Sequence, residues 1–105
     1  METYVAYDFG DRLRVVLGEE RMRDLLMGMG FYNGENSSEL FVNVSGEEEK
    51  SVIFEKLRGM GVCFSAGREW SPSEVFEYLR EKGFLNGRYR KISWKGPGNY
   101  IVEDV

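Results

Sequence analysis

The sequence predicts an α+β fold, or a small α/β one, arranged as a two-layer sandwich. Apolar residues alternate with polar ones in several short runs, as in strands, and recur at i, i+3, i+4 in others, as in helices. The two kinds of segment follow one another in the order β(β)αβαβαββ, and residues 1–105 are expected to form a single compact domain. A ferredoxin-like βαββαβ core extended by a C-terminal helix and β-hairpin fits this order, and so does a small open α/β sheet.

The first strand is expected over residues 3–9, where aromatic and β-branched side chains are frequent. Residues 12–17 allow two interpretations. Their alternating apolar side chains favour a second strand, joined to the first through a turn at Gly10. The alternative is one long helix capped by Asp11, in which Gly18 would cost about 1 kcal/mol relative to alanine. The strand is the preferred interpretation.

Three helices are expected, beginning near Glu19, after Ser45-Gly46-Glu47-Glu48 and at Ser71-Pro72-Ser73-Glu74. The last two sequences match a capping box, in which the serine accepts a free backbone N–H and the glutamate reaches back. Helical spacing predicts which side chains face the core: Met22, Leu25, Leu26, Met29, Ile53, Phe54, Leu57, Met60, Val75, Phe76 and Leu79.

The remaining strands are expected over residues 40–45, 62–64, 88–94 and 100–105. The last two form a hairpin whose tip is marked by Pro97, because proline donates no N–H to a sheet. Trp70 is expected to pack on Val75 in front of the third helix, and Asn86-Gly87 to form the turn behind it.

Missing residue types argue against several classes of enzyme. The chain has no histidine, so it has no Ser-His-Asp or Cys-His pair and no imidazole ligand for a metal. Cys63 is the one cysteine, which excludes an intrachain disulfide and a thiolate zinc site. We therefore expect no enzymatic activity, no cofactor and no metal. The absence of glutamine beside abundant Glu and Arg is typical of proteins from hot environments.

No apolar run approaches the ~18 residues that a membrane span needs, and the N-terminus lacks the basic and apolar regions of a secretory signal. The sequence therefore predicts a cytoplasmic protein with no membrane contact.

Asp8-Phe9-Gly10-Asp11, followed by the alternating segment 12–16, resembles the first hairpin of ribonuclease-H-like domains. The resemblance implies that Asp8 joins other carboxylates around a divalent metal. The candidates to join it are the run Glu47-Glu48-Glu49, Glu74 or Asp104, and the spacing does not select among them. The family also needs a third strand in its opening meander, and the sequence does not reveal one.

Positive charge is concentrated near the C-terminus of an acidic chain. Residues 80–100 carry a net charge of +5, whereas the whole chain carries −4. Along the first strand of the hairpin, alternation predicts that Ile92 and Trp94 face the core, and that Tyr89, Lys91 and Lys95 face outward with Tyr100 nearby. Basic side chains among aromatic ones suit a protein interface or a nucleic acid, while Lys and Arg also guard the edges of sheets.

The leading hypothesis is a small non-catalytic binding or regulatory protein that engages a macromolecular partner through this basic and aromatic hairpin. A protein partner is favoured over nucleic acid, and the expected contact residues are Arg88, Tyr89, Arg90, Lys91, Trp94, Lys95 and Tyr100. The alternatives are a metal-dependent nuclease or phosphodiesterase using Asp8, and a ferredoxin-like module that binds a small effector. The oligomeric state stays open, with a dimer as one option.

Overall fold

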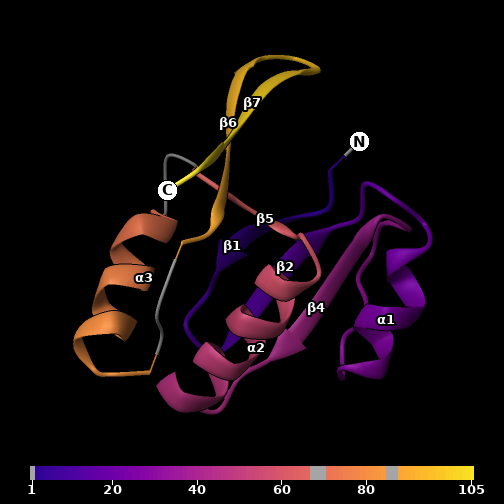
Figure 1. Ribbon diagram of the computed structural model, residues 1–105. Coiled ribbons are helices and arrows are strands. Elements are labelled where there is room, and N and C mark those ends of the chain that lie inside the picture. The colour runs from indigo at the N-terminus through magenta and orange to yellow at the C-terminus, as the bar shows by residue number, and fades with distance from the viewer. Residues whose placement is uncertain (1, 67–70, 85–87) are drawn as a thin grey trace.

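Seven strands form one mixed sheet in the computed structural model, which describes residues 2–66, 71–84 and 88–105. The sheet order is β3-β4-β2-β1-β5-β6-β7 (Figure 1). Along the described chain the elements are β1 (Tyr4–Asp8), β2 (Arg12–Val16), α1 (Met22–Gly28), β3 (Tyr32–Asn33), β4 (Glu39–Asn43), α2 (Glu47–Gly59), β5 (Cys63–Ser65), α3 (Pro72–Glu81), β6 (Arg90–Gly96) and β7 (Asn99–Asp104). The predicted mixture of helices and strands is confirmed, whereas the ferredoxin-like order is not.

The N-terminal half of the sheet is an antiparallel meander. β1 pairs with β2, and β2 pairs with β4. The preferred interpretation of residues 12–17 as a strand is therefore confirmed. The third strand that the ribonuclease-H-like resemblance needs is present as β4. Residues 40–45 were predicted as a strand, but not as part of this meander, because α1 and the unexpected short strand β3 lie between β2 and β4 along the chain.

Two helical crossovers extend the sheet on the other side of β1. α2 leads to β5, which lies parallel to β1, and α3 leads to β6, which lies parallel to β5. Parallel neighbours need such crossovers, because a tight turn returns the chain antiparallel. β7 then closes the sheet by pairing antiparallel with β6.

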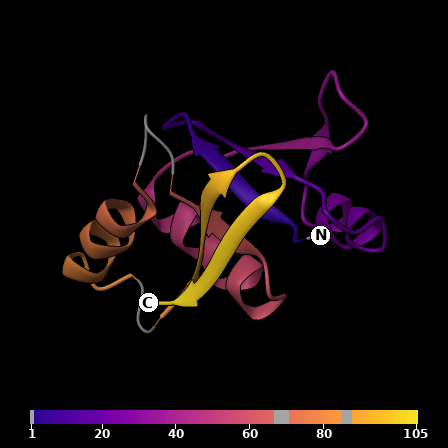
Figure 2. The same ribbon diagram turned by 90° about the horizontal axis from the view of Figure 1, so that it is seen from above.

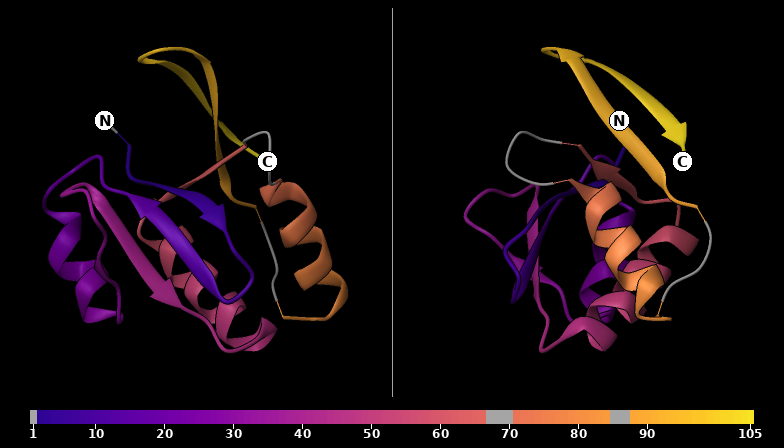
Figure 3. Two further views of the ribbon diagram at one scale, coloured as in Figure 1. Left: turned by 180° about the vertical axis from the view of Figure 1, so that it is seen from behind. Right: turned by 90° about the vertical axis from the view of Figure 1, so that its left-hand side faces the viewer.

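The helices lie on one face of the sheet (Figure 3). Buried side chains of α1, α2 and α3 belong to the same hydrophobic cluster as the inward residues of β1, β2 and β4. At its centre, four rings pack against one another: those of Phe54, Phe64, Phe76 and Tyr89. Successive side chains of a strand point to opposite faces, so the alternate residues of β1, β2 and β4 line a sheet face that carries no helix.

Three predictions about helices need correction. Leu25 was predicted to face the core but is 56% exposed. The seven-residue helix α1 buries Met22 and Leu26 instead. The Ser45 hydroxyl donates to Glu49 at 2.8 Å, rather than Glu48 reaching back, since α2 begins after Gly46. Ser71 is the N-cap of α3, as predicted, but its side chain makes no capping hydrogen bond.

The hairpin of β6 and β7 projects beyond the rest of the sheet (Figure 1). β5 pairs with β6 at Lys91 and Ile92 alone, so the strand continues past its inner neighbour toward the tip. Seen from above, the hairpin lies between α3 and α1, which occupy opposite ends of the molecule (Figure 2). The expected contact of Trp70 and the turn at Asn86-Gly87 lie outside the described residues. No helix of residues 2–66, 71–84 and 88–105 is long and apolar enough to cross a membrane.

Candidate partner-binding surface on the C-terminal hairpin

The pairing of β6 with β7 sorts the hairpin side chains onto two faces. Directly opposed residues share a face, and residues two apart along a strand share it as well. The register therefore groups Arg90, Ile92 and Trp94 with Asp104, Val102 and Tyr100. The other face carries Lys91 and Ser93 with Glu103 and Ile101.

Tyr89 belongs to the core, so its prediction as an outward contact residue is wrong. Its side chain is 3% exposed and its ring stacks on Phe76, with the ring centroids 4.1 Å apart. Its hydroxyl lies 2.6 Å from the hydroxyl of Ser73 on α3. The residue shares a face with Lys91, as predicted, but at the base of the hairpin this face meets the helices and not the solvent.

Trp94 is exposed to 37%, so its prediction as a core residue is wrong as well. It lies past the end of the pairing between β5 and β6, where no helix covers the strand. Its ring makes edge contacts with Tyr4, at 5.4 Å between centroids, and with Tyr100, at 5.3 Å. We refer to Tyr4, Trp94 and Tyr100 as the aromatic row. Ile92 beneath it is fully buried, as predicted.

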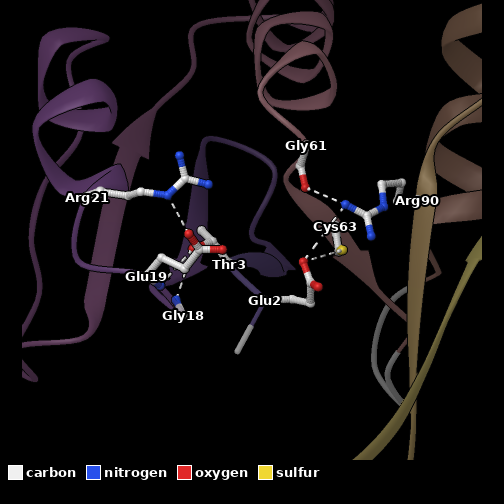
Figure 4. Close-up of polar contacts among 8 residues, drawn as sticks. All are labelled: Glu2, Thr3, Gly18, Glu19, Arg21, Gly61, Cys63 and Arg90. Atoms are coloured by element: carbon white, nitrogen blue, oxygen red, sulfur yellow. Dashed lines mark hydrogen bonds and ion pairs between the residues drawn. The ribbon is translucent and has the colours of Figure 1, made fainter.

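The positive charge of β6 is offset within the structure. Arg90 is opposite Asp104, and Lys91 is opposite Glu103. Arg90 also donates to the Gly61 carbonyl at 3.3 Å and lies 3.9 Å from Glu2 (Figure 4). Lys95 near the tip and Arg88 at the base are exposed. The hairpin is therefore less electropositive than residues 80–100 alone predict.

The basic residues do not lie on the edge strand of the sheet. Arg90 and Lys91 lie on the part of β6 that β5 and β7 flank, and Lys95 lies beyond the pairing with β5, whereas the edge strand β7 contains neither Lys nor Arg. Edge protection by Lys works where the charged side chain stands on the strand that lacks a partner. The basic residues therefore do not protect the outer edge of β7.

Cys63 lies on β5 behind the hairpin and is fully buried. Its sulfur is 3.9 Å from the Glu2 carboxylate (Figure 4). Burial raises the pKa of the Cys63 thiol; Arg90 lowers it by a smaller amount, and Glu2 and Asp104 raise it further. A thiol of this kind holds its proton at neutral pH and is hard to reach, which is unlike a reactive cysteine.

The thiol reagent 5,5′-dithiobis(2-nitrobenzoate) tests this burial at pH 8. We expect native protein to react at least ten times more slowly than urea-unfolded protein, because Cys63 becomes accessible only when the structure opens transiently. Absorbance at 412 nm measures the rate. Equal rates for native and unfolded protein would contradict the buried placement of Cys63.

Asp8, the residue that carries the ribonuclease-H-like resemblance, is held by a lysine. Lys50 on α2 donates to both carboxylate oxygens, at 3.1 and 2.9 Å, and the Asp8 side chain is 7% exposed. Asp8 also accepts from the Gly10 N–H at 2.8 Å, which fixes the turn between β1 and β2. Across the described residues, no three Asp, Glu or Cys side chains lie close enough together to hold a metal ion.

Three of the acidic residues offered as partners of Asp8 are placed near other residues. Glu49 accepts from the hydroxyl of Ser45, at 2.8 Å. Glu47 accepts from the hydroxyl of Tyr78 at 2.5 Å, and this contact raises the pKa of Tyr78. Asp104 is on the hairpin, opposite Arg90. The ion-pair partner that the structure brings to Asp8 is Lys50.

The sequence did not reveal a second aromatic cluster, which lies on the helix-free face of the sheet. The Arg12 guanidinium carbon is 4.7 Å from the ring centroid of Phe9 and 4.6 Å from that of Phe41. The Tyr32 ring stacks on that of Phe41, with the centroids 6.1 Å apart, and Tyr32 is 41% exposed. The arginine is thus already stacked between two rings. Alternation predicts that Arg12 and Phe41 face away from the core, but only the pairing of β2 with β4 brings them together.

Comparison of the chain with protein-family models, with curated protein sequences and with solved structures gives no match.

Proposed function

We propose that the protein is a small non-catalytic binding or regulatory domain, and that it engages a macromolecular partner through the outer half of the hairpin. The contact surface consists of the aromatic row and Lys95. The exposed Trp94 on a projecting hairpin carries the proposal. Trp and Tyr dominate the energetics of protein interfaces, because large rings bury much surface for little loss of side-chain entropy.

A protein partner is favoured over nucleic acid because the cations of the hairpin are largely balanced. Affinity for nucleic acid comes mainly from Lys and Arg that neutralise phosphates. Here Arg90 and Lys91 are opposite acidic residues of β7, which leaves Lys95, next to Trp94 along β6, as the exposed cation near the tip. An aromatic surface with little net charge is more typical of the centre of a protein interface.

The test is partner capture with a hairpin variant and a matched control. Trp94→Ser with Tyr100→Ser removes two rings of the aromatic row. Leu25→Ser with Val52→Ser removes two exposed apolar side chains from α1 and α2. We expect the hairpin variant to lose at least tenfold in affinity and the control to bind as the parent does, because hot-spot truncations cost about 2 kcal/mol or more each.

Equal recovery by the hairpin variant and the parent would overturn the proposal. Salt titration of the recovered complex distinguishes the partner classes, since phosphate contacts make affinity fall steeply with salt. A shallow dependence on salt is the expected result for a protein partner.

A second candidate function is a metal-dependent phosphodiesterase or nuclease that uses Asp8. The three-stranded meander with Asp8 at the end of β1 favours it. Lys50 would have to release the carboxylate before a metal could bind. Nucleic-acid cleavage with Mg²⁺ or Mn²⁺ that disappears in Asp8→Ala would support this function, and cleavage that persists in that variant would exclude it. The third alternative, a module that binds a small effector, was based on a ferredoxin-like core, and the sheet order does not confirm such a core.

A further inference from the structure

The outer edge of β7 is a long strand edge that pairs with no other strand of the described residues. β7 spans six residues at one end of the sheet, whereas β3 at the other end spans two. Proteins usually protect such edges with charged side chains, Lys above all, with Pro, a bulge or a very short strand. β7 contains neither Lys nor Pro; its charged residues, Glu103 and Asp104, lie together at its C-terminal end. This edge is therefore open to another strand.

The hydrogen bonds at the base of the hairpin show which backbone groups face outward. Tyr89 and Val105 exchange both of their backbone hydrogen bonds, at 3.1 and 3.0 Å. Hydrogen-bonded and non-hydrogen-bonded pairs alternate along an antiparallel ladder. Counting from this pair, Glu103 and Ile101 direct their N–H and C=O groups toward β6. Tyr100, Val102 and Asp104 therefore direct theirs away from β6, toward the open edge.

We propose that a second copy of this chain pairs with β7 along this edge, antiparallel, with Val102 on the two-fold axis. Tyr100 is then opposite Asp104 of the partner subunit, and Ile101 is opposite Glu103 of the partner subunit. Every outward N–H and C=O of Tyr100, Val102 and Asp104 finds a partner. Since each strand donates three N–H groups, the pairing makes six interstrand hydrogen bonds.

Charge selects this orientation and register. A parallel, in-register pairing places Glu103 beside Glu103 of the partner subunit, as does a two-fold axis at Glu103, and like charges directly opposite are destabilising. With the axis at Val102, each acidic residue is opposite an uncharged one. An axis at Ile101 also avoids like charges, but it leaves Asp104 without a strand residue opposite it.

Apolar complementarity supports the same register. Val102 is opposite Ile92 within the hairpin, so the two-fold axis brings two such pairs together. An apolar row then crosses four strands, from Ile92 through both Val102 side chains to Ile92 of the partner subunit. Symmetric pairing of identical edges closes after two copies and leaves no further open edge at β7.

The dimer uses the backbone of Tyr100 but none of the three rings of the aromatic row, because edge pairing occupies backbone groups and leaves the faces of the hairpin free. Two aromatic rows then lie on one continuous sheet. The inference therefore goes beyond the proposed function and does not depend on it. An interface limited to one strand edge is small, so we expect a weak dimer whose population rises with protein concentration.

Sedimentation velocity over a range of protein concentrations tests the pairing, with Val102→Pro compared to Val102→Ala. Proline removes the outward N–H of residue 102 and blocks an incoming strand, while the bonds of Ile101 and Glu103 to β6 remain. Alanine shortens the side chain but keeps the N–H. We expect the parent and Val102→Ala to dimerise with rising concentration, and Val102→Pro to stay monomeric with an unchanged circular-dichroism spectrum. A parent that stays monomeric throughout, or a Val102→Pro variant that dimerises as the parent does, would overturn the proposal.

Disulfide trapping gives a test that does not depend on how Val102→Pro folds. In a Cys63→Ser background, Val102→Cys places the thiols of the two copies opposite each other on the two-fold axis. The Cα atoms of such a hydrogen-bonded pair are about 5.5 Å apart, which is close enough for a disulfide. Ile101→Cys is the matched control, because its own copy is not opposite it. We expect mild oxidation to crosslink Val102→Cys at least ten times faster than Ile101→Cys. Faster crosslinking of Ile101→Cys, or equal rates for the two, would overturn the proposed register.

Discussion

Replacement of Phe76 by alanine is expected to remove about 3–5 kcal/mol from the free energy of unfolding. Phe76 is fully buried, and its ring contacts three others: Tyr89 at 4.1 Å, Phe64 at 5.0 Å and Phe54 at 5.3 Å between centroids. These rings come from α2, β5, α3 and the base of the hairpin. A cavity at Phe76 therefore loosens the packing that joins the helices to β6.

Urea denaturation followed by circular dichroism measures this loss. Glu77→Ala is the control, because Glu77 is the exposed neighbour on the same helix. Surface substitutions of this kind change stability by about 0.5 kcal/mol or less. A loss below about 1 kcal/mol for Phe76→Ala would show that the four rings do not form the centre of the core.

Replacement of Lys50 by methionine is expected to cost about 3 kcal/mol, because it leaves the Asp8 carboxylate buried without its cation. The exposed fractions of the two side chains are 14% and 7%, so solvent replaces little of the lost interaction. Asp8 keeps the N–H of Gly10 as a donor, which places the expected cost at the low end of the range for broken buried pairs.

The double variant Asp8→Asn with Lys50→Met separates the ion pair from the packing of the lysine chain. An asparagine at position 8 has no charge that needs a cation. We therefore expect the free energy of unfolding of the double variant to be at least about 1 kcal/mol higher than that of Lys50→Met, a typical coupling for contacting residues. Urea denaturation of the parent, the two single variants Asp8→Asn and Lys50→Met, and the double variant gives the coupling free energy between the two residues. Additive losses would contradict the assignment of Lys50 as the ion-pair partner of Asp8.

Local sequence signals predicted most of the elements. Alternation identified β2, β4 and the two strands of the hairpin, and the serine-proline pair located the start of α3. These signals depend only on residues that are close along the chain, so the sequence alone is enough to predict the elements. The short strand β3 was missed because two residues are too few to show alternation; it exists through its pairing with β4.

The hairpin shows where the sequence is insufficient. Alternation correctly grouped Tyr89 with Lys91 and Ile92 with Trp94, but it cannot tell which face meets the helices. That depends on α3 lying against the base of β6, which buries Tyr89, and on β5 ending early, which exposes Trp94. The neutralisation of Arg90 and Lys91 likewise follows from the register with β7 and not from composition.

The site is accordingly smaller than the sequence predicted. Of the expected contact residues, Tyr89 is in the core and Arg90 is engaged with Gly61 and Glu2. Trp94 and Tyr100 remain on the surface and gain Tyr4 as a neighbour from β1. No spacing in the sequence indicates that Tyr4 belongs with residues ninety positions later, because β5 and β6 must first bring the two segments together.

Site-specific photocrosslinking tests most directly whether the hairpin is the binding surface. A photoreactive phenylalanine analogue is placed at Trp94 on the hairpin in one protein and at Val52 on α2 in another; both positions are exposed. The account predicts a partner adduct from position 94 that unlabelled parent protein competes away, and none from position 52. Equal adducts from the two positions, or an adduct from position 52 alone, would contradict it.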